Sequence, residues 1–174
     1  MRSLACAVIL LLVASSASPA QEHHHGRKHA PYAGLEKRTA TSLSEQQIAD
    51  LRAGRGMGLA LAAELNGYPG PLHVLELADS LSLSPEQRRR VEEAYAAMKA
   101  EAVPMGERLI GQEMALDRHF KESTISAGTL VELAARIGET QGRLRAIHLK
   151  YHLVMTEVLT PDQVRRYSQL RGYR

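Results

Sequence analysis

Two histidines at helical spacing are the residues in this sequence best suited to chemistry. His148 and His152 are four positions apart, so on a helix both imidazoles extend from one face and reach a single metal ion. If the chain reverses direction near residues 124 and 125, Glu101 lies opposite His148. The three side chains would then bind Zn, Ni, Co or Cu and leave one coordination position open. Two half-buried structural histidines beside Tyr151 are the alternative interpretation.

A second candidate pair and a histidine-rich tract lie nearer the N-terminus. His73 and Glu76 are three positions apart, and residues 23–29 contain several of the chain's eight histidines. Polar tracts of this kind bind metal ions loosely, so such binding need not be physiological. The predicted metal ligands are therefore His148, His152, Glu101, His73 and Glu76, with no cofactor required.

Methionines and arginines suggest a different chemistry, the binding of other proteins. Met98 and Met105 have flexible thioether side chains, which adapt to irregular partners. Arginine clusters could surround an apolar concavity and attract acidic or unfolded chains. Helical spacing, however, also favours a core position for both methionines, and the arginines could form an ordinary solvated face. The basic positions considered are Arg88, Arg89, Arg165 and Arg166.

Catalysis and nucleic-acid binding find little support in the sequence. The only cysteine is Cys6, and the chain has no Gly-x-Ser-x-Gly, His-Glu-x-x-His or Walker motif. The glycines between Gly54 and Gly58 follow no strand pattern, so they predict a turn or close packing and not a phosphate loop. A net charge of +3 and an aromatic content of 4% do not indicate a nucleic-acid partner. We expect a protein that is not an enzyme.

The N-terminus has the anatomy of a secretory signal. Arg2 precedes an apolar run from Leu4 to Ala14, and Ser18-Pro19-Ala20 supplies the small residues of a cleavage site. The run is too short to span a bilayer as a helix, and no longer one follows. We predict a signal peptide over residues 1–20 and a periplasmic location, with no membrane span after cleavage. A polar, disordered His-rich arm over 21–41 and one helical domain over 42–174 complete the predicted organisation.

One short pattern, Leu-[Ser/Thr]-x-x-Gln, occurs three times and predicts three helix starts. The hydroxyl side chain caps the free N–H groups of the first turn, while the glutamine reaches back to the backbone of the cap residue. Proline after the cap in two copies is compatible with a first helical position. The predicted caps are Ser44 with Gln47, Ser84 with Gln87, and Thr160 with Gln163.

Apolar periodicity predicts two long helices and therefore an all-α fold. One stripe runs from Pro85 to Phe120, with a mild kink expected at Pro104. A second runs from Thr129, where Thr129 and Glu132 resemble a capping box, to Val158. Joined by a short turn, the two helices form an antiparallel hairpin. Neither buries its stripe on the other alone, so short N-terminal helices or a second subunit must cover the remainder.

The two later copies of the pattern bracket this charged hairpin downstream of a signal peptide. In this respect the chain resembles the LTxxQ family of periplasmic proteins, with Spy, CpxP and the related ZraP and CnrX group, over roughly residues 75–171. The first two copies here have serine in place of threonine. The resemblance implies a cradle-shaped homodimer without enzymatic activity. For function, the resemblance leaves two alternatives. The leading hypothesis is chaperone-like binding of unfolded client proteins or binding of a membrane stress sensor. The other is heavy-metal sensing or resistance.

Overall fold

The computed structural model describes residues 30–173 of the chain. The predicted signal peptide, its cleavage site at Ala20 and the histidines of residues 23–29 lie outside the described residues. The chain divides into two units, residues 1–33 and 34–174. Within the first, the described residues form a turn in which the Ala33 N–H donates to the Ala30 carbonyl at 2.8 Å.

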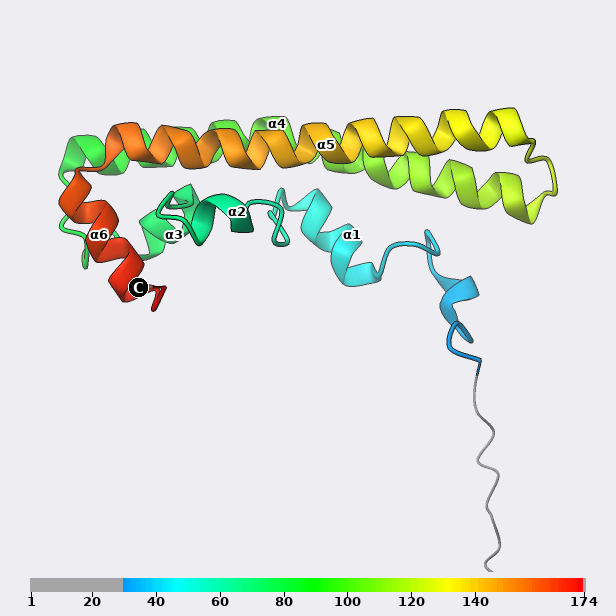
Figure 1. Ribbon diagram of the computed structural model, residues 1–174, viewed down its shortest axis with the longest axis horizontal. Helices are drawn as coiled ribbons and strands as arrows, with labels where there is room; N and C mark the ends of the chain where they lie inside the picture. Colours follow the sequence, from blue (N-terminus) through cyan, green and yellow to red (C-terminus); the bar gives the residue numbers. More distant parts are fainter. Residues whose placement is uncertain (1–29, 174) are drawn as a thin grey trace, which may run out of the picture. The chain divides into compact units, whose positions relative to one another are not determined.

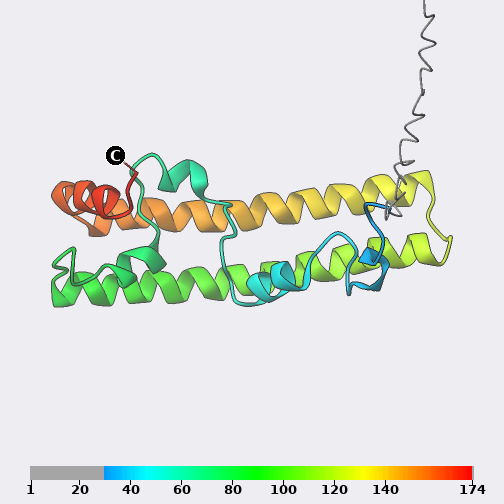
Figure 2. The ribbon, with the colours of Figure 1, turned by 90° about the horizontal axis from the view of Figure 1, so that it is seen from below.

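The second unit is all-α, as the sequence predicted. Two long helices, α4 and α5, pack antiparallel as a hairpin, and short helices precede them (Figure 1). The short helix α1 contacts α4, α2 contacts α5, and α3 contacts both long helices, so all three lie along one side of the hairpin (Figure 2). The elements are η1 (Leu35–Lys37), α1 (Glu45–Arg52), α2 (Leu61–Glu64), α3 (Pro71–Glu76), α4 (Pro85–Lys121), α5 (Ala127–Val158) and α6 (Pro161–Leu170).

All three predicted capping boxes are present. Ser44, Ser84 and Thr160 each accept a hydrogen bond from the backbone N–H three residues later. In each case the glutamine at that later position accepts one from the N–H of the cap residue. The pattern therefore fixes the first turns of α1, α4 and α6 by satisfying N–H groups that have no partner within the helix.

Two of these boxes are also bonded to each other at the base of the hairpin. The Gln87 side-chain amide donates to Gln163 Oε1 at 2.8 Å, and the Gln163 amide donates back to Gln87 Oε1 at 3.0 Å. Each amide also donates to a backbone carbonyl, Gln87 to Val158 at 3.0 Å and Gln163 to Leu81 at 3.2 Å. We call this arrangement the glutamine pair. It connects the start of α4 to the start of α6, whereas Gln47 takes part in its own box alone.

The hydrophobic core consists of two clusters along the hairpin. The base cluster gathers Val74, Val91, Met155 and Tyr167, all nearly inaccessible to solvent. The middle cluster packs α1 against both long helices through buried aliphatic side chains. Here α1 crosses α4 closely, because a Cβ on Gly106 would lie 2.7 Å from the Leu51 carbonyl oxygen. Only glycine permits that approach.

Several element boundaries differ from the predictions. The cap of α5 is Ser126, whose hydroxyl accepts from the Thr129 N–H, so the helix begins earlier than the predicted start at Thr129. Ser126 captures that N–H and leaves Thr129 inside the first turn. Pro104 lies in the middle of α4, which continues through it. Pro71 opens the short helix α3, which ends at Glu76.

The polar segment before α1 is also more ordered than the predicted arm. Ala40 is fully buried in the middle cluster, and Thr41 donates through its N–H to Asp117 Oδ2 at 2.7 Å and through its hydroxyl to Oδ1. These bonds to α4 place the end of the predicted arm inside the folded unit. Within residues 30–173, no helix combines the length and apolar character needed to cross a membrane.

Candidate functional site

A pocket of about 300 Å³ lies where the segment 54–73 covers the hairpin. Its lining comes from the glycine-rich turn before α2, from α2 and the start of α3, and from both long helices. Within this segment, the sequence predicted a turn or close packing at the glycines and a metal ligand at His73. The lining residues include Gly56, Met57, Leu61, Glu64, Gly70, Leu72, His73, Tyr95, Met98, His148 and His152.

The two histidines of α5 both line this pocket. His148 and His152 are only 3% and 8% exposed. His152 Nδ1 lies 2.6 Å from the Tyr68 carbonyl oxygen, which can only accept, so this nitrogen carries the proton and the Nε2 of a neutral ring is an acceptor. His148 Nε2 is buried without a hydrogen-bond partner among the described residues. Burial, with the neighbouring His152 as a smaller cause, lowers the pKa of His148, which favours its neutral form.

A buried carboxylate, Glu64, completes the polar part of the pocket. Its Oε1 accepts from the hydroxyls of Tyr167 and, at 3.0 Å, Tyr173, and it lies 3.7 Å from Arg171 Nε. Its Oε2 has no hydrogen-bond partner in the described chain, and His152 Nδ1 lies 3.6 Å from it. Burial and the bond to Glu64 raise the pKa of Tyr167, so its hydroxyl stays a donor. Glu64 was not among the predicted site residues.

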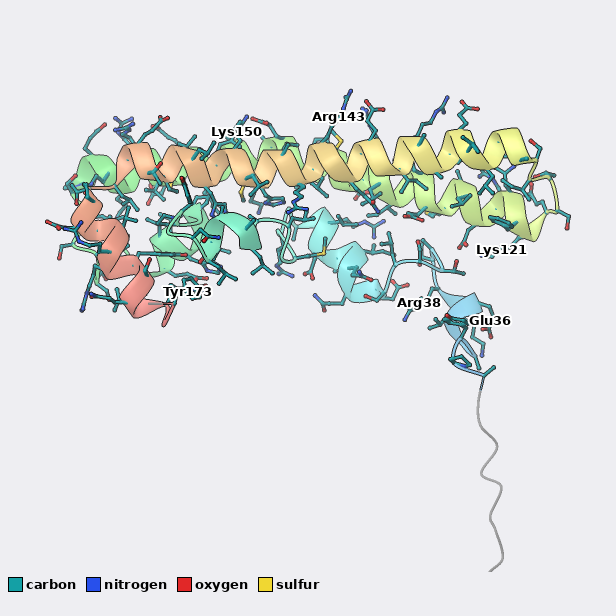
Figure 3. All side chains as sticks on the ribbon, in the orientation of Figure 1. Glu36, Arg38, Lys121, Arg143, Lys150 and Tyr173 are labelled. Atoms are coloured by element: carbon teal, nitrogen blue, oxygen red, sulfur yellow. The ribbon has the colours of Figure 1, made fainter. Side chains whose placement is uncertain are left out.

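Glu101 does not join the histidines, contrary to the prediction. Its carboxylate accepts from Lys150 Nζ at 2.7 and 2.8 Å and from the Tyr151 hydroxyl at 2.7 Å. These bonds, that of Lys150 first, lower the pKa of Glu101. The hairpin register thus pairs Glu101 with residues just beyond His148. Lys150 projects from the side of the hairpin away from the short helices, as does Arg143 (Figure 3).

The second predicted metal pair forms but remains isolated. His73 Nδ1 lies 2.8 Å from Glu76 Oε2 on one turn of α3, near the surface. His73 also lines the pocket. Across residues 30–173, no group of three or more His, Cys, Asp or Glu side chains is arranged to hold a metal ion.

The predicted client-binding residues lie mostly in the core or in local ion pairs. Met98 is buried at 6% exposure, and Met105 is half-buried against the middle cluster, as their helical spacing allowed. Among the arginines, Arg88 pairs with Asp79, Arg89 with Glu86 and Glu93, and Arg165 with Asp162; Arg166 is exposed. The arginines remain exposed to solvent, and none of them lines the pocket beneath segment 54–73.

Exposed apolar side chains are concentrated on the segment that covers the pocket. We call this set, whose members are 37% to 54% exposed, the apolar rim. Three of its members also line the pocket, so the rim and the pocket form one continuous surface. A second exposed apolar set, including Leu130 and Val131, lies near the hairpin turn. The rim consists of Met57, Leu61, Leu65, Tyr68 and Leu72.

Comparisons of this chain with protein-family models, with curated proteins and with solved structures found no match.

Proposed function

We propose that this protein is a non-enzymatic binding protein of the bacterial envelope that captures apolar segments of unfolded or partner proteins on the apolar rim. The observation that supports the proposal is the concentration of large exposed apolar side chains on one short segment beside a pocket. Exposed apolar groups of this kind, bordered by polar residues, mark protein-interaction surfaces. Met57 on the rim adds a side chain that adapts to different partners.

The way the rim is built suits such a role. Its residues lie on the short helix α2, on the turns around it and at the start of α3. In the turns, Gly58 and Gly67 adopt positive φ angles of 82° and 85°. The long hairpin beneath supplies a rigid base. In a cradle-shaped homodimer of the kind that the LTxxQ resemblance implies, the rims of two protomers would bind one client together. A membrane stress sensor is a second possible partner for the same surface.

Suppression of aggregation tests this proposal. We expect the protein to suppress aggregation of a reduced or heated model protein at near-stoichiometric ratios. Replacing Leu61 and Leu65 with Asp should abolish the effect, because the rim then carries charge where the client needs an apolar surface. The matched control places Asp at Leu130 and Val131, which are also exposed and apolar. No suppression across several clients, or equal loss in both double variants, would reject the proposal.

Heavy-metal sensing or resistance is the second candidate, and one observation favours it: both histidines of α5 line the same pocket. Titration of Zn, Ni, Co and Cu against a competing chelator should then reveal one tight site, in addition to loose binding elsewhere. Changing His148 and His152 to Ala in the full chain should remove that site alone. Unchanged affinity in the double variant would exclude this pocket as the metal site.

A further inference from the structure

Two glycines let the covering segment lie directly against the two pocket histidines. A Cβ on Gly56 would lie 3.4 Å from His148 Nδ1, and one on Gly70 would lie 3.0 Å from His152 Cε1, 3.1 Å from His152 Nε2 and 3.4 Å from Glu64 Oε2. The φ of Gly70 is −87°, a conformation that any residue adopts. Glycine at position 70 is therefore required by the close approach to the ring and not by the backbone. A side chain at either glycine would press on the polar groups at this end of the pocket.

The polar atoms around that space act mainly as acceptors. Glu64 contributes a carboxylate whose Oε2 has no hydrogen-bond partner among the described residues. Nδ1 of His152 donates to the Tyr68 carbonyl, which leaves Nε2 as the ring nitrogen that can accept. The ring of His148, which burial keeps neutral by lowering its pKa, provides one more acceptor. A ligand that satisfies these atoms must supply several N–H or O–H donors.

Most of the remaining lining is apolar, although Arg55, which pairs with Asp50, and His73 also contribute to it. Met57, Leu61 and Leu72 line its mouth and continue onto the rim. A ligand entering from the rim therefore meets aliphatic surface before it reaches Glu64. That order, an apolar stem followed by a group of donors, is the chemistry of a primary alkylammonium.

We propose that this pocket binds a primary ammonium group on an aliphatic stem, with Glu64 as its counter-ion. The inference deepens the proposed function, on which it rests for the source of the ammonium: the lysine side chain of a protein segment held on the apolar rim. Free alkylamines share the same chemistry. A metal ion fits less well at this point, because the imidazole nitrogen nearest Glu64, His152 Nδ1 at 3.6 Å, carries a proton and cannot act as a ligand.

Free ligands test the pocket without any client. Butylammonium and 1-butanol have the same stem, and their binding can be followed through the NMR signals of the histidine rings in the full chain. We expect butylammonium to bind at least about tenfold more tightly, because a charged donor meets a buried carboxylate. Glu64→Gln should remove this preference while retaining an oxygen for Tyr167 and Tyr173. Glu107→Gln, at an exposed ion pair with Arg52, is the control.

Gly56→Ala provides a second variant that leaves every polar group in place. Its methyl group would meet His148 at 3.4 Å, so the protein should fold, as thermal unfolding would check, but bind butylammonium at least several-fold more weakly. Equal affinities for butylammonium and butanol would overturn the proposal. So would a stoichiometric Zn site that excludes butylammonium and is insensitive to Glu64→Gln.

Peptide pairs identify the source of the ammonium. An apolar peptide with one central lysine should bind at least about tenfold more tightly than the same peptide with norleucine, and Glu64→Gln should equalise them. Butylammonium binding without this peptide preference would overturn lysine as the source. If Gly56→Ala does not change the suppression of aggregation, and a lysine in the bound segment does not either, the ammonium pocket is rejected. The apolar rim would then remain the client site, so the two proposals can fail separately.

Discussion

The glutamine pair leads to a sharp prediction about stability. In Gln163→Ala, the chain loses four hydrogen bonds: those with the Thr160 N–H at 2.9 Å and the Leu81 carbonyl at 3.2 Å, and both bonds with Gln87, at 2.8 and 3.0 Å. The hydroxyl of Thr160 still caps α6, because its partner is a backbone N–H. At about 1 kcal/mol for each half-buried bond, the expected loss in free energy of unfolding is roughly 3 to 4 kcal/mol.

The first copy of the pattern is the matched control. Gln47 makes a single such bond, with the Ser44 N–H at 2.9 Å, and its side chain is exposed. Gln47→Ala should therefore cost about 1 kcal/mol or less. Urea unfolding followed by circular dichroism measures both variants, with the slope showing whether the transition remains two-state.

A double-mutant cycle isolates the bonds between the two glutamines. Because Gln87→Ala and Gln163→Ala remove the same reciprocal bonds, their combined effect should fall short of the sum by roughly 1 to 2 kcal/mol. Equal losses for Gln47→Ala and Gln163→Ala, or strict additivity in the cycle, would refute the claim that the pair stabilises the hairpin base.

Three further predictions follow from the fold and the site. His148 has a lowered pKa in the folded state, so the unfolded chain binds the proton more readily. The free energy of unfolding should therefore be highest above the ordinary pKa of 6.5 and decline as the pH falls below it. His148→Asn should flatten that decline when thermal unfolding is measured as a function of pH. Gly106→Ala would place a methyl group 2.7 Å from the Leu51 carbonyl oxygen, so urea unfolding should show a loss of about 1 to 3 kcal/mol in stability. Unchanged stability would argue against close packing of α1 on α4 at Gly106. Glu101→Gln weakens a largely exposed ion pair with Lys150, so the free energy of unfolding should fall by less than about 1 kcal/mol, and metal affinity measured by calorimetry should not change. A large drop in metal affinity would restore Glu101 as a ligand.

Local signals explain what the sequence could predict. The three capping boxes involve residues three positions apart, and the long helices follow an apolar period that is interrupted only briefly, at Gln112 and near Thr140. Both features could therefore be recognised from neighbouring residues. The wrong start of α5 arose from the same kind of signal, because Ser126 and Thr129 both have hydroxyl groups and compete for the cap. Local pattern alone does not decide between two adjacent candidates.

The candidate site depends on contacts that no local pattern encodes. Glu64 lies on a four-residue helix without a detectable period, and its partners Tyr167 and Tyr173 are 103 and 109 positions away. The histidine pair was visible from its spacing, but the third group beside it depended on the register of the hairpin. The prediction selected Glu101 from the opposite helix, whereas the structure places Glu64 from the covering segment.

The bonds from Tyr167 and Tyr173 to Glu64 have a consequence for biosynthesis. These tyrosines are synthesised 103 and 109 residues after the carboxylate that they orient. A polypeptide interrupted shortly after Leu159 would contain both pocket histidines and the whole apolar rim but would lack the two hydroxyls and Gln163. Until synthesis passes Tyr173, the nascent chain therefore carries the apolar rim beside a Glu64 carboxylate that has neither of its hydroxyl donors.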